Sequence, residues 1–325
     1  RGLDFISMYH RQKSANYTIY RRGPGTGTRF LVFNMNGRKK ADGTPFVPPH
    51  KLAWFRDRRF RRAVAHAIDR DRIRKTIFHG FAYTQNSPVS EANTRFFSGA
   101  RTDGEFAKYP LVVYEFNLEK ANALLDEMGM TGRDGEGYRT QADASGETHR
   151  VEFLINTYAQ SPEYQKIASI MKDDLKAVGI KVNAQQIPFA ALVRKLMREW
   201  DWETIIIGLT GGYSDPMNGG RNVWPTTGNL HMWNPRQKNL STAFEWEKEL
   251  NSLFEQAQKT PSEAERQLLA ARFQHIVTRE VPLIYTVQSE SITAVRNRFG
   301  NFNPSVYSLV DYMMIFDRNA KLIQQ

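Results

Sequence analysis

The chain has 325 residues, 41% of them hydrophobic and 12% aromatic, which excludes a disordered chain and leaves room for two lobes. No stretch approaches the roughly 18 consecutive apolar residues of a membrane-spanning helix. The absence of cysteine excludes disulfides, thiol catalysis and thiolate metal sites, and it is compatible with a location outside the cytoplasm.

The formal net charge of +11 raises the question of nucleic-acid binding. The basic residues are spread over most of the chain, and the densest group, residues 56–75, is interrupted by three aspartates. This pattern favours a solvated basic surface, so a nucleic-acid-binding protein stays the distant alternative. The chain begins at Arg1 without a methionine or an apolar signal segment, so we expect that processing or truncation removed its true beginning.

The first predicted strand covers residues 28–33, a β-rich run. The glycine-rich segment 23–27 before it resembles a phosphate loop but lacks the Gly-Lys-Ser/Thr ending, and no long helical pattern follows. We therefore interpret it as a turn.

The next segment, residues 55–83, predicts two consecutive helices. Asp57 is suited to cap the first helix, Asp69 opens the second, and Gly80 ends it. One buried stripe is expected on the first helix, formed by Phe60, Ala63, Val64, Ala67 and Ile68. The arginines between these apolar positions are expected mainly on the solvated outer face.

Alternating helical and strand patterns follow. Asn117 caps a predicted helix over 118–128, and the strand 151–155, the helix from 162 and the strand 180–182 form a predicted βαβ unit. A helix over 189–199 and a strand over 204–207 repeat this pattern.

Two late helices each begin with a predicted capping box. The first box runs from Thr242 to Glu245 and the second from Thr260 to Glu263. A strand over 281–287 follows.

The segment from 55 to 89, FRDRRFRRAVAHAIDRDRI…GFAY…SPV, strongly resembles the D-x-R-V-R-x-A-hydrophobic-x-x-A-I-D-R signature of extracellular solute-binding proteins, family 5. These are the oligopeptide- and dipeptide-type receptors of ABC importers. The run 117–129 and the strand 281–287 resemble later landmarks of that family. The resemblance covers nearly the whole chain but only the later part of a family member.

The resemblance implies an α/β fold of the type II periplasmic-binding-protein class, two-lobed with mixed sheets and with one lobe incomplete. Residues 1–33 are then a remnant of the first lobe, 34–282 the second lobe, and 283–325 the return to the first. The hinge between the lobes is expected at the two crossings, at Phe33, Asn34, Asn36 and Tyr285.

No pattern of catalytic or metal-binding residues is evident. The seven histidines are scattered without an HExxH spacing, and no Gly-x-Ser-x-Gly motif exists. The turn 134–138 lacks the acidic positions of a calcium loop. We therefore predict no catalytic residue, no metal site and no cofactor, and a protein that is not an enzyme.

The strongest candidate site is the segment 208–216, GLTGGYSDP, which follows the strand 204–207 and so occupies the carboxyl end of a sheet strand. Its glycines allow another backbone to approach, and its free amides and carbonyls could pair with an extended peptide, although a plain tight turn is equally compatible. The resemblance implies that the segment lines a ligand cleft. The predicted binding residues here are Leu209, Thr210, Gly211, Gly212, Tyr213 and Asp215.

This segment departs from the family pattern at one position. Peptide-binding relatives often have an aspartate where Gly212 stands, so a free ligand amino group is not necessarily the recognised feature. Downstream, Trp224, His231 and Trp233 lie in polar loops, where they could stack on a ligand or pack as a lid. These two observations favour an oligosaccharide as the alternative ligand.

The expected function is therefore capture of an oligopeptide-like solute, with hinge closure and no bond chemistry. The expected partners are the peptide or oligosaccharide and the membrane permease of an ABC importer, with no nucleic acid. The expected location is periplasmic or extracellular, either free or anchored through a missing N-terminal segment.

Overall fold

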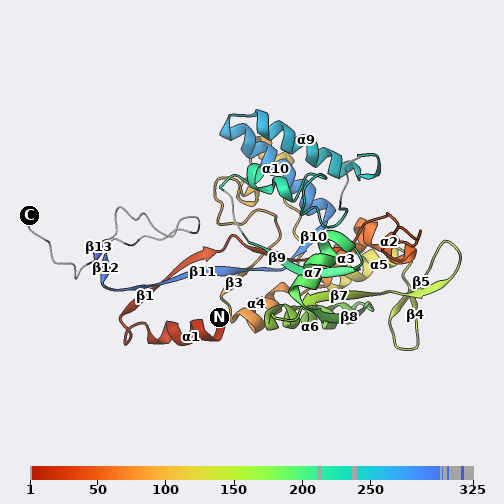
Figure 1. The fold of residues 1–325 in the computed structure, drawn as a ribbon, viewed down its shortest axis with the longest axis horizontal. Helices are drawn as coiled ribbons and strands as arrows, with labels where there is room; N and C mark the ends of the chain where they lie inside the picture. The colour runs from red at the N-terminus through yellow and green to blue at the C-terminus, as the bar shows by residue number, and fades with distance from the viewer. Residues whose placement is uncertain are drawn as a thin grey trace, which may run out of the picture.

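The computed structural model describes residues 2–210, 214–235, 240–300, 302, 306, 316 and 317. They form an α/β fold in which a mixed sheet is covered by helices (Figure 1). The helices are α1 Gly2–Arg11, α2 Pro49–Arg56, α3 Arg58–Ala67, α4 Arg70–Phe78, α5 Leu118–Glu127, α6 Pro162–Ala177, α7 Phe189–Arg194, α8 Pro216–Gly219, α9 Glu245–Lys259 and α10 Glu263–Glu280. Short helical turns are η1 Ser98–Ala100, η2 Gly104–Lys108, η3 Lys195–Glu199, η4 Gly220–Asn222 and η5 Leu240–Thr242.

The central sheet has five strands in the order β10-β2-β9-β7-β8. The strands of the protein are β1 Tyr17–Pro24, β2 Thr28–Phe33, β3 Ala82–Thr84, β4 Gly132–Arg133, β5 Arg139–Ala142, β6 Thr148–Arg150, β7 Glu152–Tyr158, β8 Lys181–Ile187, β9 Thr204–Leu209, β10 Leu283–Tyr285, β11 Val287–Arg296, β12 Phe299–Gly300 and β13 Phe316–Asp317. β7 is parallel to β8 and β9, and β2 is antiparallel to β9 and β10. The predicted βαβ unit is thus confirmed, with α6 packed on β7, β8 and β9.

The side chains of β2 are the centre of the hydrophobic core. Phe33 is fully buried, with its ring centroid 4.9 Å from that of Phe55 and 5.4 Å from that of Phe153. Phe60 of α3 packs edge-on against Phe33 at 5.7 Å, as its place in the apolar stripe predicts. The stripe therefore joins the helix pair α3–α4 to the sheet.

Helix caps divide into three correct predictions and two wrong ones. Asp57, Asp69 and Asn117 each accept a 2.8 Å hydrogen bond from a first-turn amide of α3, α4 and α5. The predicted capping boxes at Thr242 and Thr260 are wrong, because the N-cap positions are two residues further along the chain, at Phe244 and Ser262.

At the start of α9, the Glu247 carboxylate accepts a 2.9 Å hydrogen bond from the Phe244 amide. At the start of α10, the Ser262 side chain accepts from the Glu265 amide. Glu245 and Glu263 are therefore the first residues of their helices. A capping box needs its glutamate at the third helical position, so neither residue can close one.

The prediction that the arginines of α3 and α4 lie mainly on the outer face is wrong for Arg61 and Arg70, which are 2% and 6% exposed. Arg61 donates two hydrogen bonds to the Glu280 carbonyl, at 3.1 and 2.8 Å, and one to the Phe55 carbonyl at 2.7 Å. Arg70 donates to the carbonyls of Tyr285 at 2.8 Å and Tyr114 at 3.0 Å. A guanidinium can hold several carbonyls at once because it carries five donors in a fixed plane.

These buried guanidinium groups remain charged at neutral pH. Burial lowers the pKa of Arg61 and of Arg70 to about 10, which is still well above neutrality. Their charge is therefore matched by backbone carbonyl dipoles inside the protein and adds nothing to a basic surface.

The strand pairing bears on the predicted lobes. β2 and β10 belong to the central sheet, so residues 28–33 and 283–285 lie with the body formed by 34–282. β1 and β11 pair as a long ribbon that runs away from this body (Figure 1). The division into two lobes stays a prediction.

The predicted hinge residues lie in the core. Phe33, Asn34 and Asn36 are fully buried, and the Asn34 amide donates to the carbonyls of Trp200 and Trp202 at 2.9 and 2.8 Å. Their hinge role stays a prediction.

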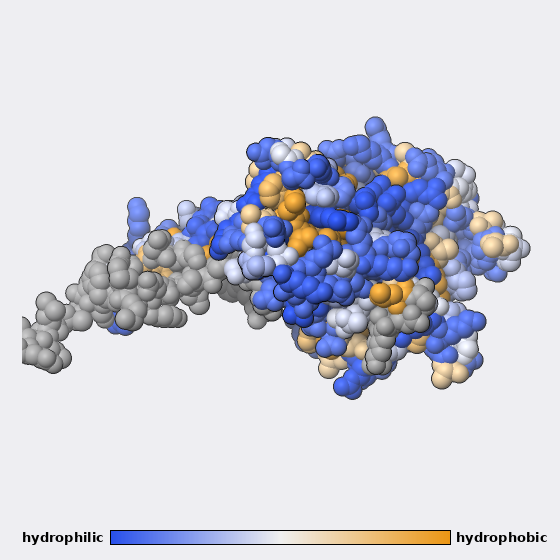
Figure 2. Space-filling model, turned by 90° about the horizontal axis from the view of Figure 1, so that it is seen from above, coloured by the Kyte–Doolittle hydropathy of each residue, from blue (hydrophilic) through white to orange (hydrophobic). Residues whose placement is uncertain are grey.

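The surface is mostly polar, and apolar side chains gather in a patch framed by polar ones on the face in Figure 2. Within the described part of the chain, no helix combines the length and apolar character needed to cross a membrane.

We expect Arg61→Leu to lower the free energy of unfolding by about 3 kcal/mol, because the carbonyls of Glu280 and Phe55 lose their donors in a buried site. Chemical denaturation measures this change. Lys75→Leu is the control, since the Lys75 side chain is 67% exposed and its ion pair with Asp71 is superficial. Equal effects of the two substitutions would contradict the proposed role of Arg61.

Candidate ligand-binding site

A pocket of about 180 Å³ lies at the carboxyl end of β9. The end of β9 forms one wall with β2 and β10, and the segment 88–93, the α8–η4 region and Phe273 of α10 form the others. The lining residues are Thr26, Thr28, Phe30, Pro88, Val89, Ser90, Asn93, Leu209, Thr210, Pro216, Gly219, Gly220, Asn222, Val223, Trp224, Leu230, Phe273, Leu283 and Tyr285. The pocket thus occupies the position where open α/β sheets bind ligands.

Four of the residues predicted for the site or the hinge meet in this pocket: Leu209, Thr210, Trp224 and Tyr285. Gly211, Gly212 and Tyr213 lie outside the described residues. The Asp215 carboxylate caps α8 by accepting a 2.9 Å hydrogen bond from the Met217 amide, and it pairs with Arg266 at 3.0 Å.

The lining is apolar, with hydroxyl and amide groups. Among the described residues that line the pocket, none carries a formal charge at neutral pH. Tyr285 is neutral there, because burial raises the pKa of its phenol well above the usual value. The pocket therefore suits an uncharged group with a large apolar part.

The size of the pocket limits what it can hold. Sites for whole small ligands usually measure about 300–1,000 Å³, whereas this pocket is about 180 Å³. It has room for one amino-acid side chain or one sugar ring, and a longer ligand would extend beyond it.

Trp224 contributes to the wall but is mostly packed against other rings. It is 5% exposed, and its ring centroid lies 5.1 Å from Phe273 and 5.5 Å from Trp233. Most of its surface is therefore used in the core.

His231 and Trp233 do not line the pocket in the structure, against the expectation from their loop positions. Their side chains are buried around the fully buried carboxylate of Glu247, at 2.9 Å from the His231 Nε2 and 2.7 Å from the Trp233 Nε1. Glu247 also accepts from the Asn234 side chain at 3.1 Å. Both side chains therefore fix the segment that follows Trp224 to α9, and their role towards a ligand stays a prediction.

Sequence reasoning missed the walls that come from 88–93 and from Phe273. In the sequence, the residues SPV at 87–89 are only the end of the family signature, and their position beside the pocket depends on how the loop returns to α10. From the sequence alone, Phe273 is one more apolar residue on the buried face of a helix.

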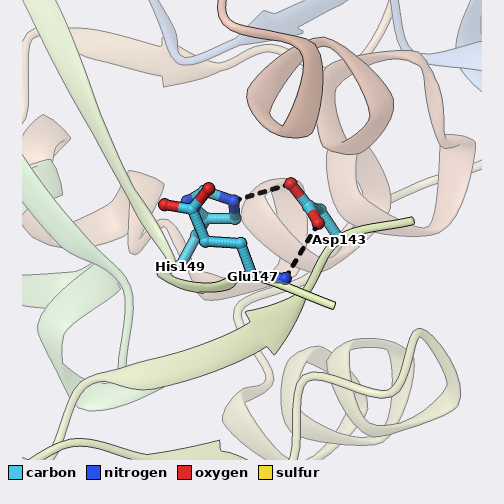
Figure 3. A group of neighbouring side chains, drawn as sticks. All are labelled: Asp143, Glu147 and His149. Atoms are coloured by element: carbon cyan, nitrogen blue, oxygen red, sulfur yellow. Dashed lines mark hydrogen bonds and ion pairs between the residues drawn. The ribbon is translucent and has the colours of Figure 1, made fainter. Parts of the chain in front are cut away.

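A separate group of polar side chains closes the β5–β6 hairpin (Figure 3). Ligand atoms of Asp143, Glu147 and His149 lie within 4.8 Å of one another. Asp143 accepts hydrogen bonds from Ser145 and from the Glu147 amide, and its second oxygen lies 2.9 Å from the His149 Nε2. The Ser145 hydroxyl and His149 hold the pKa of the Asp143 carboxyl well below its usual value. The turn itself explains these contacts.

His149 also stacks on His50 of α2, with centroids 3.8 Å apart and planes inclined by 7°. Burial, followed by the neighbouring His149, lowers the pKa of His50.

We expect acid to weaken the fold through His50. Its pKa is lower in the folded state, so the unfolded chain binds the proton first, and the free energy of unfolding falls as the pH drops below the ordinary value of 6.5. His50→Phe keeps a ring in the stack and removes the titration, so unfolding curves measured between pH 7 and about 5 should depend less on pH. Some dependence remains, because His66 also has a lowered pKa. An unchanged slope would contradict the assignment.

We expect Glu247→Ala to lower the free energy of unfolding by about 3 kcal/mol or more, because three buried side-chain donors and the half-buried Phe244 amide lose their acceptor. Glu245→Ala on the same helix is the matched control; its carboxylate is 88% exposed and should contribute below about 1 kcal/mol. Denaturant unfolding of both variants makes the comparison. If Glu247→Ala proves as mild as the control, the buried cluster does not hold this segment.

A mixed α/β sheet with a pocket at the carboxyl end of a strand is consistent with the fold class of the periplasmic binding proteins. The chain belongs to the bacterial extracellular solute-binding proteins, family 5: the model of the family's middle region matches residues 3–230.

Among individual relatives, a protein of Deinococcus radiodurans named "Probable ABC transporter-binding protein" is 28% identical over 295 residues, which is 86% of this chain and 45% of that protein. The chain thus spans less than half the length of this relative.

Solved structures show the same fold. The oligopeptide-binding protein AppA of Bacillus subtilis, in complex with a nonapeptide, matches with a TM-score of 0.69 and 17% identity, over 98% of this chain and 55% of AppA. The periplasmic binding protein MelB of Agrobacterium fabrum, in complex with stachyose, matches with a TM-score of 0.75 and 18% identity, over 94% of this chain and 44% of MelB.

Proposed function

We propose that this chain is part of an extracytoplasmic receptor that captures an oligopeptide-like solute and delivers it to the permease of an ABC importer. The family supports a solute-binding role. The observation that carries the choice of ligand is the small uncharged pocket at the end of β9, which has the size and polarity for one apolar side chain of a peptide.

The peptide backbone is proposed to lie along the segment that begins at Leu209 and Thr210. Both residues line the pocket, and Thr210 is exposed. A peptide that extends past the pocket is proposed to pair through its main chain along this segment, which would make binding largely independent of the peptide sequence. The first lobe is proposed to close over this surface by a hinge motion, without bond chemistry.

An oligosaccharide is the alternative ligand, because MelB is similar in fold and its structure contains stachyose. Two features of the pocket favour the peptide. Trp224 is packed by Phe273 and Trp233, which leaves little of its ring for stacking on a sugar. The described lining also lacks the charged side chains that can form strong hydrogen bonds to many sugar hydroxyls.

The proposal predicts a preference that can be measured by calorimetry on the natural full-length gene product. Alanine pentapeptides with one leucine, placed at each position in turn, are compared with the same peptides carrying aspartate. The best leucine peptide should bind about tenfold more tightly, because the pocket would have to desolvate the carboxylate without a partner. Thr210→Trp should weaken the leucine peptide by about tenfold, since it fills the mouth of the pocket.

Thr148→Trp is the matched control, since Thr148 is an equally exposed threonine in β6, away from the pocket. Binding of stachyose without binding of any peptide would replace the peptide with the alternative ligand. If the protein binds both a peptide and stachyose tightly, and Thr210→Trp weakens neither, the site lies elsewhere.

A further inference from the structure

A second cavity, of about 660 Å³, lies beside the first. It is bounded by residues 84–91, by the loop 97–113 that contains η1 and η2, and by Gln288 of β11. Val89 lines both cavities, so its side chain stands between them. Neither the family match nor the proposed peptide site gives this space a role.

Three buried oxygen atoms of its lining residues have no hydrogen-bond partner within the described part of the chain. They are Gln85 Oε1, Asn86 Oδ1 and Ser98 Oγ. Gln85 and Ser98 are 3% and 5% exposed. Buried polar atoms are nearly always paired in folded proteins, so three unpaired oxygens on one cavity indicate a missing partner.

The wall that carries these oxygens is held in place by other hydrogen bonds. Gln85 Nε2 donates to the Ser87 carbonyl at 2.9 Å, which fixes Gln85 Oε1 as the free acceptor. Gln274 of α10 accepts from the Ser87 hydroxyl at 3.1 Å and from the Ser98 amide at 3.2 Å. The two serines are thus held to one buried glutamine, and the site exists before any ligand arrives.

The rest of the wall is largely apolar, with the exposed Glu91 on one side and one cation, Arg101, that already has partners. Arg101 donates to Gln267 at 2.7 Å, and its guanidinium lies 4.9 Å from the ring centre of Phe106. Phe97, Leu111 and Val113 add apolar surface, and Val113 is 57% exposed at the edge of the cavity. A ligand here would meet apolar contacts on one side and hydrogen-bond acceptors on the other.

We propose that this cavity is a second ligand site, for a neutral small molecule that combines an apolar face with at least two N–H or O–H donors. Two donors would satisfy Gln85 Oε1 and Asn86 Oδ1, and an acceptor on the ligand would receive the Ser98 hydroxyl. The volume lies within the range of about 300–1,000 Å³ that small-molecule sites occupy.

Benzamide is a suitable probe, because its primary amide provides two donors and one acceptor on an apolar ring. N,N-dimethylbenzamide is the matched analogue, which keeps the ring and the carbonyl but has no donor. In ¹⁵N-labelled full-length protein, benzamide should shift the amide signals of Gly99 and Ala100 saturably, at about millimolar affinity, and the analogue should bind at least about tenfold more weakly.

Ser98→Ala tests the site from the protein side. The substitution removes an oxygen that has no partner, so the fold should be as stable as before or more stable, while benzamide should bind roughly three- to tenfold more weakly. Ser252→Ala, at an exposed serine of α9, is the control and should leave both measurements unchanged.

The proposal is overturned if neither compound binds saturably, if both bind equally, or if Ser98→Ala leaves the affinity for benzamide unchanged. It is also overturned if the shifts appear at Gly219 and Gly220, which line the first pocket, or if a crystal soaked with benzamide holds only ordered water beside Gln85. Should Ser98→Ala fail to fold, the comparison of the two probes still decides.

Discussion

The architecture depends on arginine side chains that reach from α3 and α4 to the backbone where α10 ends and β10 follows. Arg61 and Arg62 bond the carbonyls of Glu280 and Arg279, and Arg70 bonds that of Tyr285. Carbonyls at the end of a helix have no partner within that helix, so a buried end needs donors from elsewhere. The arginines supply them, and they fix the strand whose Leu283 and Tyr285 form part of the pocket wall.

Most of the fold could be predicted because its signals are local. The caps at Asp57, Asp69 and Asn117 and the alternation of strand and helix around α6 each depend on neighbouring residues. The burial of Arg61 could not be predicted from the sequence. Helical periodicity places a side chain on one face of the helix, but it does not show which backbone carbonyls lie opposite that face. The late capping boxes were misplaced for a related reason: the fully buried Glu247 serves both the start of α9 and the loop aromatics.

The candidate site shows the same division. Leu209 and Thr210 could be predicted, since they follow a buried strand and a strand's carboxyl end is a general location for ligands. Pro88, Val89 and Phe273 could not, because their position depends on long-range packing of a loop against α10. The loop tryptophans show why residue type alone is a weak guide: Trp224 reaches the pocket, whereas Trp233, nine positions later, is fully buried on Glu247.

The two cavities share one support, which is α10. Its Gln274 holds the loop through the Ser98 amide and the Phe96 carbonyl, and Thr278 accepts from the Val112 amide at 3.1 Å. The loop between β3 and α5 has little secondary structure of its own, so these bonds from one helix set its path and place Val89 between the cavities. Because the carboxyl end of α10 is held by Arg61, a displacement of the α3–α10 contact would reach both cavities through the same helix. The signature arginines Arg61, Arg62 and Arg70 thus hold the candidate binding surface in position without lining either cavity.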